Sequence, residues 1–397
     1  MTGSGIAMTS LDEAELRRCV ERLAPIPRPS ASAGEGRAAA MIAEELRELG
    51  AEVTLMEEPV NGTYWQPLGL LALLAVASAL VPRRSAALLA ALAAWAAADD
   101  LELGSRRLRR AVGTRACHNV LARLGPPDSD QAVLIHVHHD ASHSGRVFDT
   151  RLAKAGTRAF GPLIDRLRTT PPLLWTSVAG PALVALGQLA RSRALRVAGG
   201  ATALVNGAIL IDIGRAPVVP GANDNLSGVA AGIAAMRELA AQPPQRTSVF
   251  LFSSGSEESF LEGFDAFRRR GFPGLPREHT TCLCLESVGS PRLLLLDGEG
   301  LLRLHRYPEA VRRQVEECAR ELGIELDAPF RFRFATGGQV SLRAGIPTAV
   351  ISSLDWYNAP RNYHWPTDTP EALDYRSVRN AAALAEATVR RIDAAAQ

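Results

Sequence analysis

The chain has 397 residues, of which 47% are hydrophobic and 22% charged, a composition typical of globular proteins and unlike that of disordered chains. Its 44 lysine and arginine residues nearly balance 42 aspartate and glutamate residues, so no basic surface for nucleic acid is expected. Lys154 is the only lysine, and its surroundings fit neither a Walker phosphate loop nor a Schiff-base site.

The five cysteines are scattered and form no C-x-x-C pair, which favours reduced thiols in the core over a zinc or redox site. The first residues lack a basic stretch followed by an apolar one, so we expect no cleavable signal peptide. The length is sufficient for one large domain or two ordinary ones.

Hydrophobic periodicity predicts the main elements in chain order. A capping box at Ser10–Glu13 predicts a helix to about Leu23, and a second helix is predicted over 35–49. Strands are predicted at 51–55, 120–124, 133–137, 249–252, 282–285 and 348–351, and helices at 226–240, 260–269, 308–322 and 370–395. This alternation predicts an α/β fold with a mixed, largely parallel central sheet covered by helices on both faces.

Two segments break this pattern and predict apolar helical hairpins. The segment 61–114 contains the apolar stretches 67–81 and 85–98, and the segment 146–214 contains 173–190 and 197–211. The remaining ranges, 1–60, 115–145 and 215–397, would form a single catalytic domain. At 1.5 Å per residue these stretches span roughly 21–27 Å, which makes crossing a ~30 Å bilayer core marginal.

We expect the hairpins to dock the protein on a membrane, with the cytoplasmic membrane as the first candidate. Arginines occur in the turns of both hairpins and beyond the first one, so charge does not fix an orientation. Two alternatives stay open: the hairpins pack on each other, or they pair across a homo-oligomer. In either of these cases the protein would be cytoplasmic.

Acidic and histidine side chains follow three of the predicted strands, and two loops add more. The set comprises His138 and Asp140 after 133–137, Glu257 and Glu258 after 249–252, Glu286 after 282–285, Asp224 in the turn 221–228, and His364 and Asp368 in the loop 362–368. Because ligands bind beyond the carboxyl ends of strands in open α/β sheets, we expect these side chains to lie close together.

This set suits a pair of divalent cations, which in two-metal sites lie ~3.5–4 Å apart. Asp224 can bridge the two ions, His138 and Glu286 can complete one zinc site, and Glu258 and His364 can complete the other. Glu257 stands next to a ligand without being one, as a general base requires.

Asp140 is counted with Glu257 among the catalytic residues because it is placed to orient the imidazole of His138, and Asp368 is placed to orient His364. Tyr363 could donate to an oxyanion or contact the substrate, although packing is an equal alternative. Taken singly, these residues have ordinary structural explanations, such as a helix N-cap for Asp224 and acids in a first helical turn for 257–258.

Five motifs, in this order, resemble peptidase family M28. They are His138-His-Asp140, the turn 221–228, Ser256-Glu-Glu258, Glu286-Ser-Val-Gly289 and the loop 363–369. The resemblance implies a zinc exopeptidase-like fold, two zinc ions, and aminopeptidase-type cleavage of peptide or amide bonds by the residues named above. The chain departs from the family at Glu286, where aspartate is usual, and at Gly337, where aspartate is frequent.

Two other functions compete with an aminopeptidase. One is a membrane-associated amidohydrolase whose substrates are N-acyl or lipid-like amides reaching the site along the hairpins. The other is a non-catalytic receptor or scaffold, against which the complete ligand set argues. A serine hydrolase is disfavoured because the chain has no G-x-S-x-G elbow.

Overall fold

The computed structural model describes residues 12–81 and 83–396. The helices are α1 Glu13–Leu23, α2 Ala33–Glu48, α3 Trp65–Leu80, α4 Arg84–Leu101, α5 Arg107–Ala111, α6 Thr150–Leu167, α7 Thr176–Leu189, α8 Arg193–Arg215, α9 Ser227–Ala241, α10 Glu262–Arg269, α11 Glu309–Leu322, α12 Gly337–Arg343 and α13 Tyr375–Ala395. The strands are β1 Glu52–Val60, β2 Arg115–Leu124, β3 Gln131–His138, β4 Thr247–Ser254, β5 Thr280–Glu286, β6 Arg292–Glu299, β7 His305–Arg306, β8 Asp327–Phe332 and β9 Thr348–Leu354.

These strands form one mixed sheet in the order β1-β2-β4-β3-β5-β9-β6-β7, with β8 paired to β6. Its centre, β4-β3-β5-β9, is parallel, whereas β1 and β2 on one side and β6 on the other are joined antiparallel. The expected mixed, largely parallel centre is therefore confirmed. All four central strands end at the same edge of the sheet, where the predicted ligands follow them.

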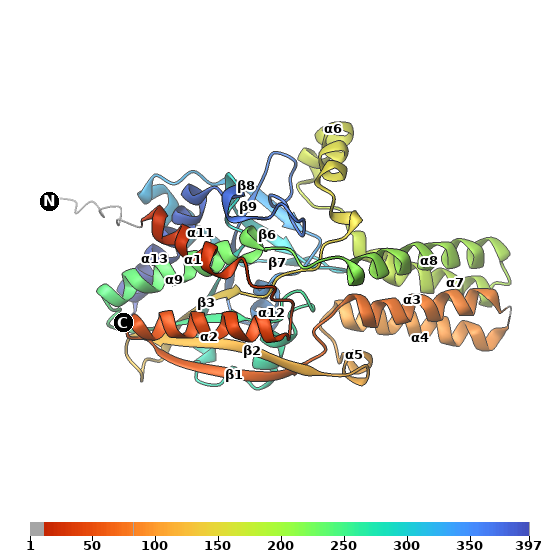
Figure 1. Ribbon diagram of the computed structural model, residues 1–397, viewed down its shortest axis with the longest axis horizontal. Coiled ribbons are helices and arrows are strands. Elements are labelled where there is room, and N and C mark those ends of the chain that lie inside the picture. Colours follow the sequence, from red (N-terminus) through yellow and green to blue (C-terminus); the bar gives the residue numbers. More distant parts are fainter. Residues whose placement is uncertain (1–11, 82, 397) are drawn as a thin grey trace.

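Helices cover both faces of the sheet because the central strands are apolar on both sides (Figure 1). On β3, Val133, Ile135 and Val137 pack with α1, α2, α9, α11 and α13. The alternate residues, Ala132 and Leu134, face the other layer, which α10 and α12 supply with phenylalanines and Val340. Burial on both faces explains why these strands are continuous apolar runs in the sequence.

Each strand and helix predicted from periodicity is present within a few residues of its expected ends. The N-cap of α1 is Asp12, which accepts a hydrogen bond from the Ala14 amide, whereas the proposed cap Ser10 lies outside the described residues. Outside the inserts, four strands and helices were not predicted: β6, β7, β8 and the short helix α12. The helix α6 falls within the second insert, where no helix boundaries were predicted.

The two apolar hairpins pack against each other and form one bundle of four described helices (Figure 1). α3 and α4 form the first hairpin, α7 and α8 the second; α7 packs on α4, and α8 packs on α3. The bundle projects from the body as an arm, with its root beside the sheet edge that carries the predicted ligands. The alternative that the hairpins pack on each other is thus observed, and it leaves open what covers the outside of the bundle.

Candidate metal centre

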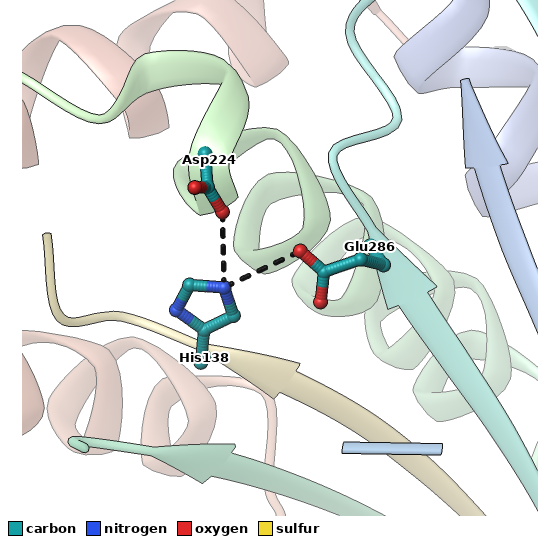
Figure 2. Close-up of side chains that lie close together, drawn as sticks. All are labelled: His138, Asp224 and Glu286. Atoms are coloured by element: carbon teal, nitrogen blue, oxygen red, sulfur yellow. Dashed lines mark ion pairs between the residues drawn. The ribbon is translucent and has the colours of Figure 1, made fainter. Parts of the chain in front are cut away.

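The predicted ligands gather at the carboxyl ends of the central strands. His138 is the last residue of β3 and Glu286 the last of β5, while Asp224 lies in the turn that precedes α9 (Figure 2). The side chains of all three are buried and point toward a common centre. The parallel pairing of β3 with β5 is what brings two of them together across the sheet.

The three side chains are spaced as ligands of one ion would be. His138 Nε2 lies 3.2 Å from Asp224 Oδ1 and 3.5 Å from Glu286 Oε1. Two ligands that each lie about 2.0–2.1 Å from one tetrahedral zinc ion are separated by roughly 3.3 Å, which matches these spacings. Glu286 therefore reaches the centre from the end of β5 despite its extra methylene relative to aspartate.

Asp224 also faces a second imidazole. Its other oxygen, Oδ2, lies 3.0 Å from His364 Nε2, so the carboxylate stands between two histidines as a bridging ligand would. Glu258 lines the same cavity but does not belong to the three-residue cluster. Its Oε1 lies 3.4 Å from His143 Nδ1, a residue to which sequence reasoning gave no specific role. The structure therefore assembles the first predicted zinc site more completely than the second.

The turn carrying Asp224 is pinned to the end of β5 by its polar neighbours. Asn225 donates to the Leu285 carbonyl at 2.9 Å and accepts from the Ser287 amide, and Asn223 accepts from the Gly289 amide at 2.8 Å. Gly228 permits the close approach, because a Cβ there would lie 2.6 Å from the Leu285 carbonyl oxygen. These residues of the motif 221–228 fix the distance between Asp224 and Glu286.

Asp140 organises the site without entering the cavity. Its Oδ1 lies 3.1 Å from His138 Nδ1, which fixes the imidazole with Nε2 toward the centre. Its two oxygens also accept from the amides of Glu257 and Glu258 at 3.1 and 3.0 Å, and Ser30 donates to it. Asp140 is fully buried and is therefore a positioning residue rather than a group that meets the substrate.

Asp368 has a different role from the expected one. It does not contact His364; instead it accepts from the amides of Asn223 at 2.7 Å and Asp224 at 3.2 Å. The chain turns between Trp365 and Asp368, which aims the carboxylate at the 222–224 backbone, and the Nδ1 atom of His364 has no hydrogen-bond partner among the described residues. Burial raises the pKa of Asp368 to about 8.

A buried arginine that sequence reasoning missed connects these loops. Arg28 donates to the His139 carbonyl at 2.7 Å and to the Gly221 carbonyl at 2.9 Å, so it ties the end of β3 to the turn that carries Asp224. Burial lowers its pKa to about 10, although the nearby carboxylates of Asp140, Asp368 and Asp224 favour the charged form. An isolated arginine near position 28 carries no sequence signal, because its partners are all distant in the chain.

Glu257 has the freedom that a proton-transfer group needs. Both of its carboxylate oxygens are buried and have no hydrogen-bond partner among the described residues. Burial, together with the charges of Glu286, Asp140 and Glu299, raises its pKa well above the ordinary value, and His138 opposes the shift. The side chain lines the same cavity as the three-residue cluster, so it can reach a substrate bound there.

The cavity above the cluster has a volume of about 260 Å³ and apolar walls. Tyr363 stacks on His364 with ring centroids 3.9 Å apart and lines the cavity beside it. The apolar lining comes from the body and from the root of the bundle and includes Phe148, Leu174, Ile209, Leu210, Ile213, Phe260 and Phe334. Arg333 is the one arginine in the lining, and its guanidinium lies over the ring of Trp175.

The donor set fits zinc. Four carboxylates and two imidazoles face the cavity floor, giving a negative charge that a divalent cation would neutralise. Burial alone would lower the pKa of His138, but the carboxylates of Glu286, Asp140 and Asp224 raise it well above its ordinary value. His138 Nε2 and Glu286 Oε2 lack hydrogen-bond partners among the described residues, as atoms reserved for a metal would.

Comparison with known proteins relates this chain to a peptidase family and to solved structures of the same fold. The model of peptidase family M28 matches residues 211–389, which contain four of the five motifs. A Zn-dependent exopeptidase from Parabacteroides distasonis is similar over 98% of this chain and 99% of its own, with 14% identity and a TM-score of 0.57. No curated protein sequence matches significantly.

Two other solved structures share the fold. A glutaminyl cyclase from Bacteroides thetaiotaomicron covers 96% of this chain and 97% of its own at 13% identity, with a TM-score of 0.58. An aminopeptidase from Aneurinibacillus sp. strain AM-1 covers 97% of this chain and 94% of its own at 13% identity, with a TM-score of 0.55. The family match over residues 211–389 and this fold together support an M28-like metal-dependent hydrolase.

Proposed function

We propose that this protein hydrolyses peptide or amide bonds at a pair of zinc ions and that it acts as an aminopeptidase. The observation that carries the proposal is the position of Glu257, an unpartnered buried carboxylate in the cavity that also contains His138, Asp224 and Glu286. His138, Asp224 and Glu286 would hold one ion, and Asp224, Glu258 and His364 the other.

Each residue has a separate role in the proposed reaction. Zinc bound to these ligands supplies the Lewis acidity that activates water and polarises the scissile carbonyl. Glu257 accepts a proton from the attacking water and returns it to the leaving amine. Tyr363, which lines the cavity beside His364, would donate a hydrogen bond to the developing oxyanion. Asp140 keeps His138 oriented throughout.

A second candidate, hydrolysis of N-acyl or lipid-like amides, is favoured by the cavity lining. The walls above the ligands are apolar and are partly built by α8, through Ile209, Leu210 and Ile213. Arg333 provides a single positive charge in the lining and has no ion-pair partner among the described residues. Such a cavity suits a substrate with an apolar chain and a carboxylate better than a polar peptide.

The two candidates differ in the end of the substrate that is recognised. An aminopeptidase needs a group that selects a free α-ammonium, whereas the acids in this cavity are accounted for as the proposed ligands and base. The third reading, a non-catalytic receptor, is not favoured, because the family match and the intact ligand set both point to an enzyme.

The test combines metal analysis with a substrate panel on the purified full chain. We expect about two zinc ions per chain and hydrolysis that a chelator abolishes and zinc restores. The panel contains an aminoacyl amide, a blocked peptide amide, N-acyl amino acids of increasing chain length, and a peptide with N-terminal glutamine, since glutaminyl cyclases share the fold.

Each outcome decides between the candidates. Preference for a free α-amine supports the aminopeptidase, and preference for long-chain N-acyl amino acids supports the amidohydrolase. Cyclisation without hydrolysis would overturn both. Full activity in metal-free protein would overturn the metal-dependent mechanism, and the Glu257→Gln variant provides the matched inactive control.

A further inference from the structure

The half of the four-helix bundle that is distant from the body has its large and small residues in the reverse of the usual arrangement. In the half of the bundle distant from the body, most buried positions are small; they include Ala75, Ala86, Ala90, Ala185, Gly199 and Ala203, and the larger Val184 and Gln188 are exceptions. The exposed positions are large and apolar: Leu70, Leu73, Leu80, Leu88, Leu89, Leu92, Leu186, Leu189, Val197, Leu204, Val205 and Ile211. A bundle stable in water places its large apolar residues inside.

Small residues in the interior let the helices pack closely. A Cβ on Gly199 would lie 2.6 Å from the Val184 amide nitrogen, and one on Gly187 would lie 2.5 Å from the Arg196 amide nitrogen. Contacts through glycine and alanine are typical of helices that associate in lipid, where burying leucine gives no advantage. Interior polar groups are satisfied; Gln188, for example, donates to the Ser78 and Val81 carbonyls at 2.8 Å.

Charge is confined to the two ends of the bundle. The stretches 65–80, 85–98, 173–190 and 197–211 contain no charged residue. The tip, where α3 meets α4 and α7 meets α8, carries Arg83, Arg84, Arg191, Arg193 and Arg196, and none of these forms an ion pair with a described residue. Tryptophans lie toward the root: Trp65 begins α3, Trp175 precedes α7, and Trp95 is 61% exposed on α4. An apolar belt with aromatic residues and arginines at its margins matches a bilayer.

The amphipathic helix α6, beside the root of the bundle, also exposes its large apolar side chains. Its outward side is apolar, with Leu152, Phe160, Leu163 and Leu167 each about half or more exposed. Lys154 and Thr157 are turned instead toward the body, where they contact Tyr357. In Figure 1, α6 stands clear of the layers of the body, next to the root of the bundle. Arg158 and Arg166 add positive charge near its exposed face, whereas Arg151 is paired with Asp149.

We infer that the bundle inserts into a lipid bilayer with its arginine tip at the far headgroups, while α6 lies in the near interface. The helix α8, at 23 residues, is long and apolar enough to cross, whereas the shorter helices bring the arginines within snorkelling reach of the headgroups. A second copy of the chain is a poorer occupant, because exposed leucines occur on all four helices and one partner covers one side.

Insertion would also place the cavity at the membrane surface. Its lining includes Phe148 just before α6, Leu174 just after it, and Ile213 near the root end of α8. The inference does not depend on hydrolysis, so its test needs no activity measurement.

Flotation of the purified full chain with vesicles tests the interaction. We expect it to float with phosphatidylcholine vesicles and more completely when phosphatidylglycerol is added, because of the arginines on α6. Leu73→Arg and Leu204→Arg, both at mid-height of the bundle, should each reduce partitioning at least about tenfold. Leu163→Glu should cause a smaller loss. The matched control is Leu55→Arg, which adds the same charge at a leucine that is 44% exposed on the body.

Cysteine labelling tests whether the tip crosses the bilayer. The five native cysteines are buried, so new ones can be read above a low background. Vesicles are reconstituted with either Arg193→Cys at the tip or Arg313→Cys on the body. An impermeant maleimide should label only part of each population, and the labelled fractions of the two variants should add up to about the whole until detergent opens the vesicles. Complete labelling of both before detergent would overturn insertion. A chain that is a discrete oligomer in detergent-free buffer and does not float would overturn the membrane interaction and assign the apolar surface to contacts between copies.

Discussion

Gly337 lies directly against the ring of His136, so close that a Cβ on Gly337 would stand 1.9 Å from the imidazole Cε1. His136 is buried on β3, two residues before the ligand His138, and stacks on Phe264 with ring centroids 4.2 Å apart. The ring thus fills the space that a side chain at position 337 would use. This explains why the chain has glycine where M28 relatives often have aspartate.

Gly337→Asp should consequently destabilise the protein, by about 1–3 kcal/mol or more, because neither the ring nor the backbone has room to move. Gly337→Ala should have a smaller effect of the same sign. Thermal unfolding measures both. The double variant His136→Ala/Gly337→Ala should be more stable than His136→Ala alone. If the stability effects of the two substitutions are instead strictly additive, the two side chains do not compete for space.

The neighbouring acids Glu257 and Glu258 should behave differently when each is made neutral. Glu257→Gln should keep the bound metal while kcat falls by about 10²–10⁴-fold, because the free carboxylate that moves the proton is gone. Glu258→Gln should weaken metal binding, measured by competition with a chelator. The reverse pattern would exchange the two assignments. Both variants keep the backbone amides that Asp140 holds, but Glu258 also accepts from the His143 amide, so thermal unfolding of both variants is the control for a structural effect.

Arg333 should select substrates that carry a carboxylate. Replacing it with methionine keeps an unbranched apolar side chain and removes the charged guanidinium that lies over Trp175. The loss of a charge-assisted hydrogen bond, worth about 1.5–3 kcal/mol, should raise KM for an N-acyl amino acid roughly 10–100-fold. The corresponding N-acyl amide without a carboxylate is the matched substrate, and its KM should stay unchanged. Equal effects on the two substrates would mean that Arg333 acts on the shape of the cavity.

Glu299 should make stability depend on pH in the neutral range. It is fully buried at the end of β6, where it accepts from the Thr336 amide at 2.9 Å, and burial raises its pKa from 4.5 to about 8. The folded state therefore holds a proton that the unfolded state releases above pH 4.5. The contribution of Glu299 to the free energy of unfolding should be highest below this pH and should fall as the pH rises toward 8.

Glu299→Gln isolates this contribution. Glutamine has the same shape, retains an acceptor for the Thr336 amide and cannot titrate. Denaturant unfolding between pH 5 and 8 should give a flatter profile for this variant than for the original chain. A parallel decline in both would assign the pH dependence to other groups.

The sequence by itself determined the central sheet and which side chains are candidate ligands. Strands β3, β4 and β5 are apolar on both faces, so their ends are sharp, and His138, Glu257 and Glu286 stand at or just after them. Because parallel strands share one edge for their carboxyl ends, position along the chain already implied proximity in space. The apolar hairpins were equally plain, since helix length and the absence of charge are local properties.

Only the tertiary structure decided which polar groups meet. Asp368 follows His364 by four residues yet bonds to the amides of Asn223 and Asp224, and Glu258 faces His143. Such pairings depend on how loops from distant parts of the chain converge, which no spacing encodes. The strands β6 and β8 were missed for a related reason. They lie beyond the parallel centre of the sheet, and they pair with strands that are distant from them in the chain.

The four-helix bundle shows the same difference between what the sequence indicated and what tertiary packing decided. Composition indicated four apolar helices but not which side of each is buried, because alanine, glycine and leucine occur around the whole circumference. Packing of α7 on α8 and α4 decided that small residues face inward and leucines outward. Close approach between backbones is possible only where side chains are small, so the contacts chose the glycine and alanine faces and left the large apolar ones on the surface.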